Sequence, residues 1–298
     1  MGVLLSILIP AYGYAEGVGK ILSSLGGDQP DELEILISDD SRDEQVSQLV
    51  ADISRQYQGK LLYRRNRPGL GAAANWNSLL EEALGKYVLL LHHDEYPLGE
   101  RFAERALSLL SMAPEVDVFV MECVLKSSTG ADVRPHLPEM IRKLVLKHLP
   151  SYLFKRNVVG PVSCLIAQRA LYPRFDERLR WLVDVDAYFR LRQSTDRWRV
   201  CGELKIGSTL GRKDSITASI KGELKDIDAQ ERVYLSQKHP VARVWLAPRK
   251  YWIANALEFI AWVSMRVFTR LYHWFVRSFR AARIFANDFQ WISENDNK

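Results

Sequence analysis

Four ionisable residues follow an apolar run without a break in the stretch KYVLLLHHDEYP, at residues 86–97. They are His92, His93, Asp94 and Glu95. Imidazole and carboxylate groups can bind zinc, but adjacent residues of a strand point to opposite faces, so both histidines cannot easily reach one ion. The other histidines show no ligand spacing and are scattered at His136, His148, His239 and His273. The spacing of the histidines therefore argues against a zinc site at residues 92–95.

Two other apolar runs end in a comparable way. LEILISDD ends in Asp39 and Asp40, and SILIPAY ends in Pro10, Ala11 and Tyr12. In open α/β sheets, ligands bind beyond the carboxyl ends of the strands. A single acidic pair is equally well explained by helix capping or a solvated turn. Two such pairs facing one predicted crevice favour ligand binding.

Alternating strands and helices are predicted to position these residues. The sequence predicts strands over 4–10, 33–40, 60–66 and 86–95, with helices over 16–25, 43–57 and 69–85. Near-continuous apolar strands separated by helices are typical of a parallel sheet covered on both faces. The second half is less regular, with a strand within 158–173, a helix from about Asp184, and a strand and loop over 199–219. The predicted fold is therefore α/β, with a mostly parallel sheet flanked by helices.

Composition narrows the class of protein. The chain has 298 residues, and its 47% hydrophobic content allows a sizeable core. Three cysteines without CxxC spacing argue against a disulfide framework and fit a reducing cytoplasm. The N-terminus lacks a basic segment, so we interpret it as a first strand rather than a signal peptide. No run of 18 uncharged apolar residues occurs, so we expect no regular membrane span.

The net charge of +5 comes from the C-terminal tail, residues 241–298, which holds nine Lys/Arg against four Asp/Glu. Helical spacing of its many Trp, Phe, Tyr and Arg residues predicts a basic amphipathic helix, or two helices broken near Pro248. This composition suits a peripheral contact with an anionic membrane. Packing on the N-terminal domain or in a homodimer is the alternative. Nucleic-acid binding is disfavoured by the amount of apolar surface. We therefore divide the chain into a domain over 1–240 and a helical tail over 241–298.

Several motifs, in this order, carry a resemblance to a known family: SILIPAY, ILISDDS, RNRPGLGAAANWNSLLEEALGKYVLLLHHDE, GPVSCLI and FDERLRWLVDVDAYFRL. Together they resemble the family 2 glycosyltransferases of GT-A (Rossmann-like) fold over roughly residues 4–220. The NWN and LLHHDE segments are similar to a bacterial, polysaccharide-type branch. The glycine-rich segment is neither a Walker loop nor a dinucleotide fingerprint.

The resemblance implies a nucleotide-diphosphate sugar as donor and Mg²⁺ or Mn²⁺ held by Asp94. The family motifs place the donor contacts at Pro10, Ala11, Tyr12, Glu16, Asp39, Asn77, His93 and Arg212. Asp39 matches the acid that pairs with the nucleotide base. Packing is the alternative for Tyr12 and Asn77, and a solvated basic turn for Arg212. The chain departs from the family pattern at Gly13, where Asn is common, and at His92, where many relatives carry an acid.

The resemblance also implies that Asp184 is the general base that takes a proton from the acceptor hydroxyl, with inversion at the anomeric carbon. The alternative is that Asp184 and Asp186 only favour the start of a helix. Asp186 and Arg190 are predicted to form a structural i,i+4 pair. The implied acceptor is a glycan or a lipid-linked sugar of a bacterial surface polysaccharide, handled in the cytoplasm or at the inner membrane face. The competing function is a non-catalytic nucleotide-binding or membrane-adaptor protein of the same fold.

Overall fold

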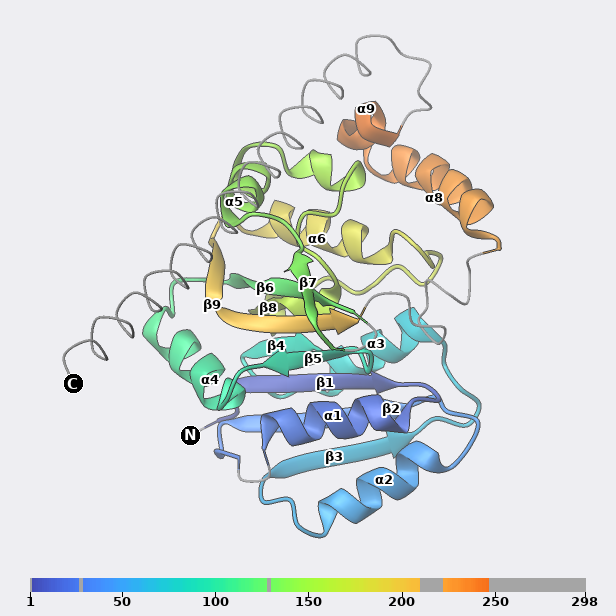
Figure 1. Cartoon of the computed structure of the whole chain (residues 1–298). Coiled ribbons are helices and arrows are strands. Elements are labelled where there is room, and N and C mark those ends of the chain that lie inside the picture. The colour runs from blue at the N-terminus through green and yellow to red at the C-terminus, as the bar shows by residue number, and fades with distance from the viewer. Residues whose placement is uncertain (1, 27–28, 128–129, 210–221, 247–298) are drawn as a thin grey trace, which may run out of the picture. The chain divides into compact units, whose positions relative to one another are not determined.

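The computed structural model describes residues 2–26, 29–127, 130–209 and 222–246 (Figure 1). The first half alternates strands and helices, as the sequence predicts. Its elements are β1 (Leu5–Ala11), α1 (Ala15–Leu25), β2 (Leu33–Asp39), α2 (Gln45–Ser54), β3 (Lys60–Arg65), α3 (Ala72–Glu82), β4 (Tyr87–Leu90), β5 (Glu95–Leu98) and α4 (Phe102–Met112).

The second half combines longer strands with a group of helices. Its elements are β6 (Val118–Lys126), β7 (Asp132–Pro135), α5 (Glu139–His148), β8 (Leu165–Gln168), α6 (Val183–Ser194), β9 (Trp198–Thr209), α8 (Leu224–Lys238) and α9 (Arg243–Leu246). Short 3₁₀ turns lie at Pro150–Phe154, Val162–Cys164, Arg169–Leu171 and Pro240–Ala242. In Figure 1, α5, α6, α8 and α9 lie together above the sheet in this view.

The described strands form one sheet in the order β3-β2-β1-β4-β8-β6-β9-β5, with β7 paired to β6. The strands β3, β2, β1 and β4 are parallel, so their carboxyl ends meet at one edge. The strand β8 runs antiparallel to both β4 and β6, and β5 runs antiparallel to β9. The α/β fold expected from the sequence is therefore confirmed, as a mixed sheet with four parallel and four antiparallel pairings among the described strands.

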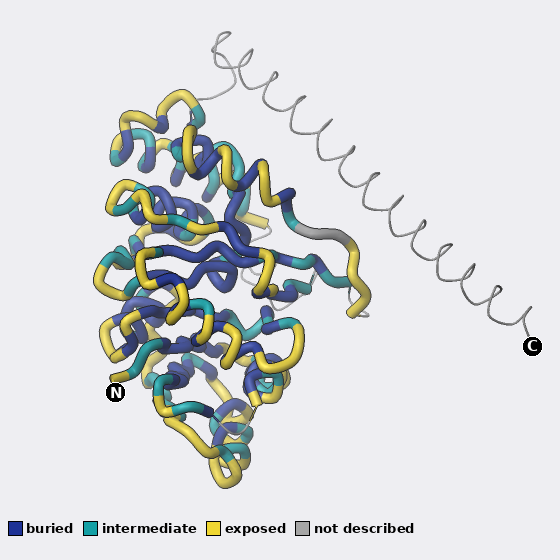
Figure 2. Tube along the Cα trace, turned by 90° about the vertical axis from the view of Figure 1, so that its left-hand side faces the viewer, coloured by how far each residue is buried: buried dark blue, intermediate teal, exposed yellow. Residues whose placement is uncertain are grey.

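Both faces of the parallel part are covered, which explains why its strands are apolar at nearly every position. Every residue of β1 and β2 is buried. On one face Ile7 and Ile35 pack in a core shared with α1, α2 and α4. On the other face α3 buries Trp76 and Leu79. Figure 2 shows the buried trace concentrated in the strands and the exposed trace in turns and outer helices.

One predicted boundary is wrong in a way that matters for the site. The strand predicted over 86–95 ends at Leu90, and Glu95 begins β5. Because β5 pairs with β9 and lies four places from β4 in the sheet, the chain leaves the parallel strands between Leu90 and Glu95. His92, His93 and Asp94 therefore lie on a connection between two strands. Conversely, Ala11, beyond the predicted strand over 4–10, is the last residue of β1.

The described chain continues beyond the predicted domain boundary at residue 240. Trp245 donates its indole N–H to Ser151 Oγ at 3.1 Å and packs edge-on against Tyr152, and Leu246 is buried. Residues up to 246 therefore pack as part of the described fold. The tail from residue 247 onward and Arg212 lie outside the described residues. Among the helices that are described, none is long and apolar enough to cross a membrane.

Candidate active site

A cluster of three potential ligands lies on the connection from β4 to β5. Nitrogen and carboxylate oxygen atoms of His92, Asp94 and Glu95 all lie within 4.8 Å of one another. His92 Nδ1 is 3.8 Å from Glu95 Oε2. One imidazole and two carboxylates form a donor set that suits a divalent cation, with Mn²⁺ tolerating nitrogen better than Mg²⁺ does.

Glu95 is held in this cluster by the sheet. Its side chain is buried at the start of β5, and its Oε1 accepts a hydrogen bond from Ser208 Oγ of β9 at 3.2 Å. Its other oxygen, Oε2, is buried without a hydrogen-bond partner among the described residues. Burial, reinforced by the charge of Asp94, raises the pKa of Glu95 well above its usual value. An orphaned buried carboxylate oxygen beside two further donors fits a cation site.

His92 is fixed by stacking and by its backbone. Its ring lies against Trp76 with centroids 4.7 Å apart, and its backbone N–H donates to Ser163 Oγ at 2.9 Å. Its Nε2 is buried without a hydrogen-bond partner among the described residues. Burial lowers the pKa of His92 to about 4, so the imidazole is neutral at pH 7. A neutral imidazole can act as a ligand where an acid was expected.

His93 points away from that cluster and joins the connection to the first strand. Its Nδ1 lies 3.3 Å from the carbonyl oxygen of Pro10, and its ring meets Tyr14 edge-on at 5.9 Å. Helix α1 approaches this connection closely at Gly17, where a Cβ would lie 1.9 Å from the His93 carbonyl oxygen. Glycine at position 17 is therefore required for α1 to pack here.

The end of β2 presents Asp39 in a fully buried position. Its Oδ1 accepts the Ser41 N–H at 2.8 Å, and its Oδ2 accepts the Tyr63 hydroxyl at 2.7 Å. Burial, and next the hydrogen bond to Asp39, raise the pKa of Tyr63 well above its usual value. The carboxylate is thus oriented by two internal donors. Nearby, Tyr12 is 54% exposed and Glu16 is exposed, so both can reach a ligand.

Asn77, predicted to contact the donor, is 1% exposed and faces another part of the chain. Its Nδ2 donates to the Phe175 carbonyl at 3.0 Å and to Glu177 Oε1 at 2.9 Å, and its Oδ1 accepts the Phe175 N–H at 2.7 Å. Both amide hydrogens are therefore used within the protein. This geometry gives no support to donor binding and corresponds to the packing alternative.

Asp184 lies in the first turn of α6, where acids are favoured by the helix dipole. Its Oδ2 accepts the Asn157 side-chain amide at 2.8 Å, and its Oδ1 accepts the Val185 N–H at 2.7 Å. Burial raises the pKa of Asp184 to about 6, against the lowering effect of these hydrogen bonds. A half-buried carboxylate with this pKa is a competent proton acceptor near neutral pH.

The segment at residues 157–163 connects Asp184 with the cluster at His92. Asn157, at one end, bonds to Asp184, and Ser163, at the other end, bonds to the His92 backbone. Between them, the Gly160 carbonyl accepts the Tyr188 hydroxyl at 3.1 Å. Burial raises the pKa of Tyr188, and the charges of Asp184 and Glu95 both add to the shift. Asp184 and Glu95 therefore both contribute to the raised pKa of the buried Tyr188.

Asp186 has the structural role predicted for it. It is fully buried, and its carboxylate meets Arg190 at 2.8 Å, Lys238 at 3.0 Å and His239 at 2.7 Å. Burial alone would raise the pKa of Asp186, but the His239 hydrogen bond and the two cations outweigh it and lower the pKa. The predicted i,i+4 pair with Arg190 is confirmed.

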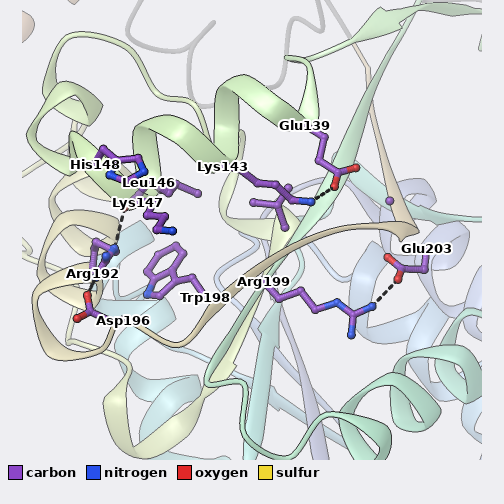
Figure 3. Close-up of a pocket in the computed structure, with 12 residues that line it drawn as sticks. Glu139, Lys143, Leu146, Lys147, His148, Arg192, Asp196, Trp198, Arg199 and Glu203 are labelled. Carbon is purple, nitrogen blue, oxygen red and sulfur yellow. Dashed lines mark hydrogen bonds and ion pairs between the residues drawn. The ribbon is translucent and has the colours of Figure 1, made fainter.

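A cavity of about 1140 Å³ lies elsewhere, between α5, the end of α6 and the first half of β9 (Figure 3). Its three acids each face a cation within the cavity: Glu139 with Lys143, Asp196 with Arg192, and Glu203 with Arg199. Because β9 runs in the same direction as β4, its beginning lies away from the edge where β4 ends. None of the predicted site residues that the structure describes lines this cavity.

Several residues of the candidate site were missed from the sequence. They are Asn157, Ser163 and Ser208. Only Asn157 had a local signal, since an Asn shortly before a Gly-Pro pair indicates a turn. The two serines carry no pattern because their roles arise from contacts 71 and 113 residues away.

Comparison with known proteins agrees with this geometry. The model of glycosyl transferase family 2 matches residues 6–177, which is more than half of the chain and ends just before Asp184. An uncharacterised glycosyltransferase of Methanocaldococcus jannaschii is 21% identical over 188 residues, 63% of each chain. An uncharacterised protein of Mycobacterium tuberculosis is 26% identical over 63% of this chain and 61% of its own. The match thus spans less than two thirds of the length of either relative.

Solved structures share the fold at low sequence identity. S. aureus TarS, residues 1–349, in complex with UDP-GlcNAc has a TM-score of 0.60 and 17% identity, over 82% of this chain and 71% of TarS. GalNAc-T7 with UDP, GalNAc and Mn²⁺ has a TM-score of 0.50 and 13% identity, over 70% of this chain and 44% of that one. The parallel strands, the acids at their carboxyl edge and the matched region together show that this chain belongs to the family 2 glycosyltransferases, with a GT-A fold.

Proposed function

We propose that the protein is an inverting glycosyltransferase. It moves a sugar from a nucleotide-diphosphate sugar to a hydroxyl of a glycan or lipid-linked acceptor, in bacterial surface polysaccharide synthesis. The observation that carries the proposal is the segment at residues 157–163, which bonds to Asp184 at one end and to the His92 connection at the other. This segment links a candidate proton acceptor, Asp184, to a candidate cation-binding cluster at His92. A direct sugar transfer needs a group of each kind. The TarS complexes with UDP-GlcNAc and UDP support a uridine nucleotide as the first donor to test.

Asp94 is proposed as the principal metal ligand, with His92 and Glu95 completing the set. One donor atom from each residue lies within 4.8 Å of the other two, and Glu95 Oε2, 3.8 Å from His92 Nδ1, is buried without a hydrogen-bond partner among the described residues. A bound Mg²⁺ or Mn²⁺ would offset the negative charge that develops on the departing diphosphate. The structure of GalNAc-T7, which was solved with UDP, GalNAc and Mn²⁺, supports the same class of cofactor.

Asp184 is proposed as the general base. It accepts the proton of the attacking hydroxyl, while that hydroxyl forms a bond to the anomeric carbon and the bond to the nucleotide breaks. A single displacement requires the base and the leaving group on opposite sides of the sugar, and therefore inverts the anomeric centre. A carboxylate with a pKa of about 6 is largely ionised at pH 7 and can take up this proton.

The remaining donor contacts are proposed from the first two strand ends. Asp39 and the exposed ring of Tyr12 lie at the carboxyl ends of β2 and β1, where the nucleotide base would bind. Arg212 is retained as a candidate contact to the diphosphate. The basic tail over 241–298 is proposed to bring the enzyme to the inner membrane face, where a lipid-linked acceptor would be found.

A thermal-shift panel tests the donor site directly. Purified protein is melted with UDP, dTDP, GDP or CMP, each with and without Mn²⁺. One diphosphate should raise the melting temperature in a metal-dependent way, because a ligand that binds only the folded state stabilises it. Asp94→Asn should lose this increase. Glu100→Gln removes an exposed acid near the end of β5 and should keep it.

Each departure from that pattern has a distinct meaning. A metal-dependent shift that survives in Asp94→Asn would show that Asp94 is not the principal ligand. A shift in the wild type without sugar transfer to any acceptor would support the non-catalytic nucleotide-binding function instead.

A further inference from the structure

Helix α8 reaches the catalytic segment through Glu231. Glu231 is 6% exposed, and its carboxylate accepts three consecutive backbone N–H groups, those of Arg180 at 2.5 Å, Trp181 at 3.1 Å and Leu182 at 2.7 Å. These groups lie at or before the start of α6, where a helix leaves its first N–H donors unpaired. An anion contributed by another helix therefore fixes the backbone that leads into Asp184.

The position of Glu231 is itself fixed by other contacts of α8. Tyr234 donates to Asp176 Oδ2 at 2.6 Å, and Lys238 bridges Asp176 at 2.8 Å and Asp186 at 3.0 Å. Three points of contact, spaced along one helix, hold α8 against the 176–186 segment. The position of the Glu231 carboxylate is therefore set by the docking of α8 as well as by the side-chain rotamer of Glu231.

Asn157 holds the same acid from the other side. Its Oδ1 accepts the N–H groups of Val159 and Gly160, both at 3.0 Å, which fixes the amide in a tight turn. Its Nδ2 donates to Gly160 O and to Asp184 Oδ2, both at 2.8 Å. Every hydrogen of the amide is used, and one of them points at the proposed base.

We propose that Glu231 and Asn157 are a pair of positioning residues for Asp184, with Glu231 setting the backbone that carries it and Asn157 setting the orientation of its carboxylate. The proposal deepens the proposed function and rests on Asp184 acting as the base. Glu231 lies 54 residues beyond the matched region of the family, so the base would be positioned by a part of the chain outside that region.

The two residues have opposite electrostatic effects on Asp184, which makes the proposal testable. The Asn157 hydrogen bond favours the ionised carboxylate, whereas the negative charge of Glu231 disfavours it. Burial, and next the charge of Asp184, raise the pKa values of the Tyr172 and Tyr188 phenols. Both phenols therefore stay neutral over the pH range of the titration. Removing either partner should therefore move the Asp184 titration, and in opposite directions.

The experiment follows the Asp184 carboxyl by carbon-13 NMR in full-length protein with labelled aspartate, using the signal missing from Asp184→Asn as its assignment. The midpoint is expected near pH 6 in the wild type. It should rise by about one unit in Asn157→Ala and fall by about one unit in Glu231→Gln. Glu223→Gln is the matched control, because Glu223 is an exposed acid near the same segment and pairs with the Arg180 side chain.

Thermal melts first establish that each variant is folded. Because the two variants disturb different segments, Glu231→Gln tests the role of Glu231 and Asn157→Ala tests the role of Asn157, even if the other variant does not fold. An unchanged midpoint in Glu231→Gln or in Asn157→Ala, or shifts in the same direction, would overturn the proposal. With an active enzyme, both variants should lower kcat about 10- to 100-fold while the affinity for nucleoside diphosphate stays unchanged. Full transfer by Asp184→Asn would refute the proposed base whatever the titrations show, so the two failures are distinguishable.

Discussion

Replacing Asn77 with alanine separates packing from donor binding at a residue for which the sequence allowed both. Asn77 projects from α3 to the segment at Phe175 and Glu177, almost 100 residues later in the chain. The substitution removes three hydrogen bonds at once. It also leaves the N–H and carbonyl of the buried Phe175 without these partners.

The size of the effect follows from these groups. A buried donor or acceptor left without a partner costs about 1–3 kcal/mol. Two such backbone groups therefore imply a loss of about 2–6 kcal/mol in the free energy of unfolding. For a domain of this size, each kcal/mol lowers the melting temperature by about 2–4 °C. A decrease of about 4–24 °C is expected, which is well outside the error of a thermal melt.

The assay combines thermal melts with calorimetric titration of the nucleotide identified in the ligand panel. Asn77→Ala should melt earlier and bind that nucleotide, at a temperature where it is folded, with unchanged affinity. Glu81→Ala is the matched control, because Glu81 lies one turn later on α3 and meets Arg174 at an exposed site. Such a pair contributes about 1 kcal/mol or less. A stable Asn77→Ala variant that fails to bind nucleotide would refute the packing role.

Three other substitutions test the reasoning in the same preparation. Because the pKa of Asp184 is raised to about 6, its ionisation opposes folding as the pH rises from about 4 to 6. A pKa about two units above the ordinary value corresponds to about 3 kcal/mol, so Asp184→Asn should be stabilised by up to about 3 kcal/mol at pH 7.5 and not at pH 4, as measured by melts at both values. Asp186→Asn should lose about 2–4 kcal/mol in chemical denaturation, because its cationic partners remain partly buried without their anion; a loss below about 1 kcal/mol would contradict this. Gly17→Ala should abolish the metal-dependent nucleotide shift by displacing the His93 backbone, whereas Gly19→Ala, which meets only a Leu side chain at 3.3 Å, should retain it.

Local pattern predicted the first half of the fold well. Strands such as β1 and β2 were predictable because they are covered on both faces, and an apolar run of that length has few alternatives. The i,i+4 pair of Asp186 and Arg190 followed from helical periodicity alone. The predicted end of β4 was wrong. The apolar run continues through Leu91, but the next strand, β5, pairs with β9 and not with β1.

Individual side-chain roles were less predictable. Asn77 and His93 lie at positions that match the family motifs, yet each bonds to the protein's own backbone. Whether an amide or an imidazole faces a ligand or a carbonyl depends on the packing of distant segments, and no local spacing encodes that. Glu231 carried no signal at all, because its partners lie about 50 residues earlier in the chain.

The sequence by itself determined the alternation of strands and helices, the placement of acids at strand ends and the membership of the family, because these depend on periodicity and on motif order. Only the tertiary structure decided how deeply each acid is buried and which partners it has. Burial raises the pKa values of Asp184 and Glu95, while the His239 hydrogen bond and the partly buried Arg190 and Lys238 lower the pKa of Asp186. The physical reason is that the ionisation of a carboxylate depends on its solvation and on its charged and hydrogen-bonding partners, and both of these are supplied by residues far away in the chain.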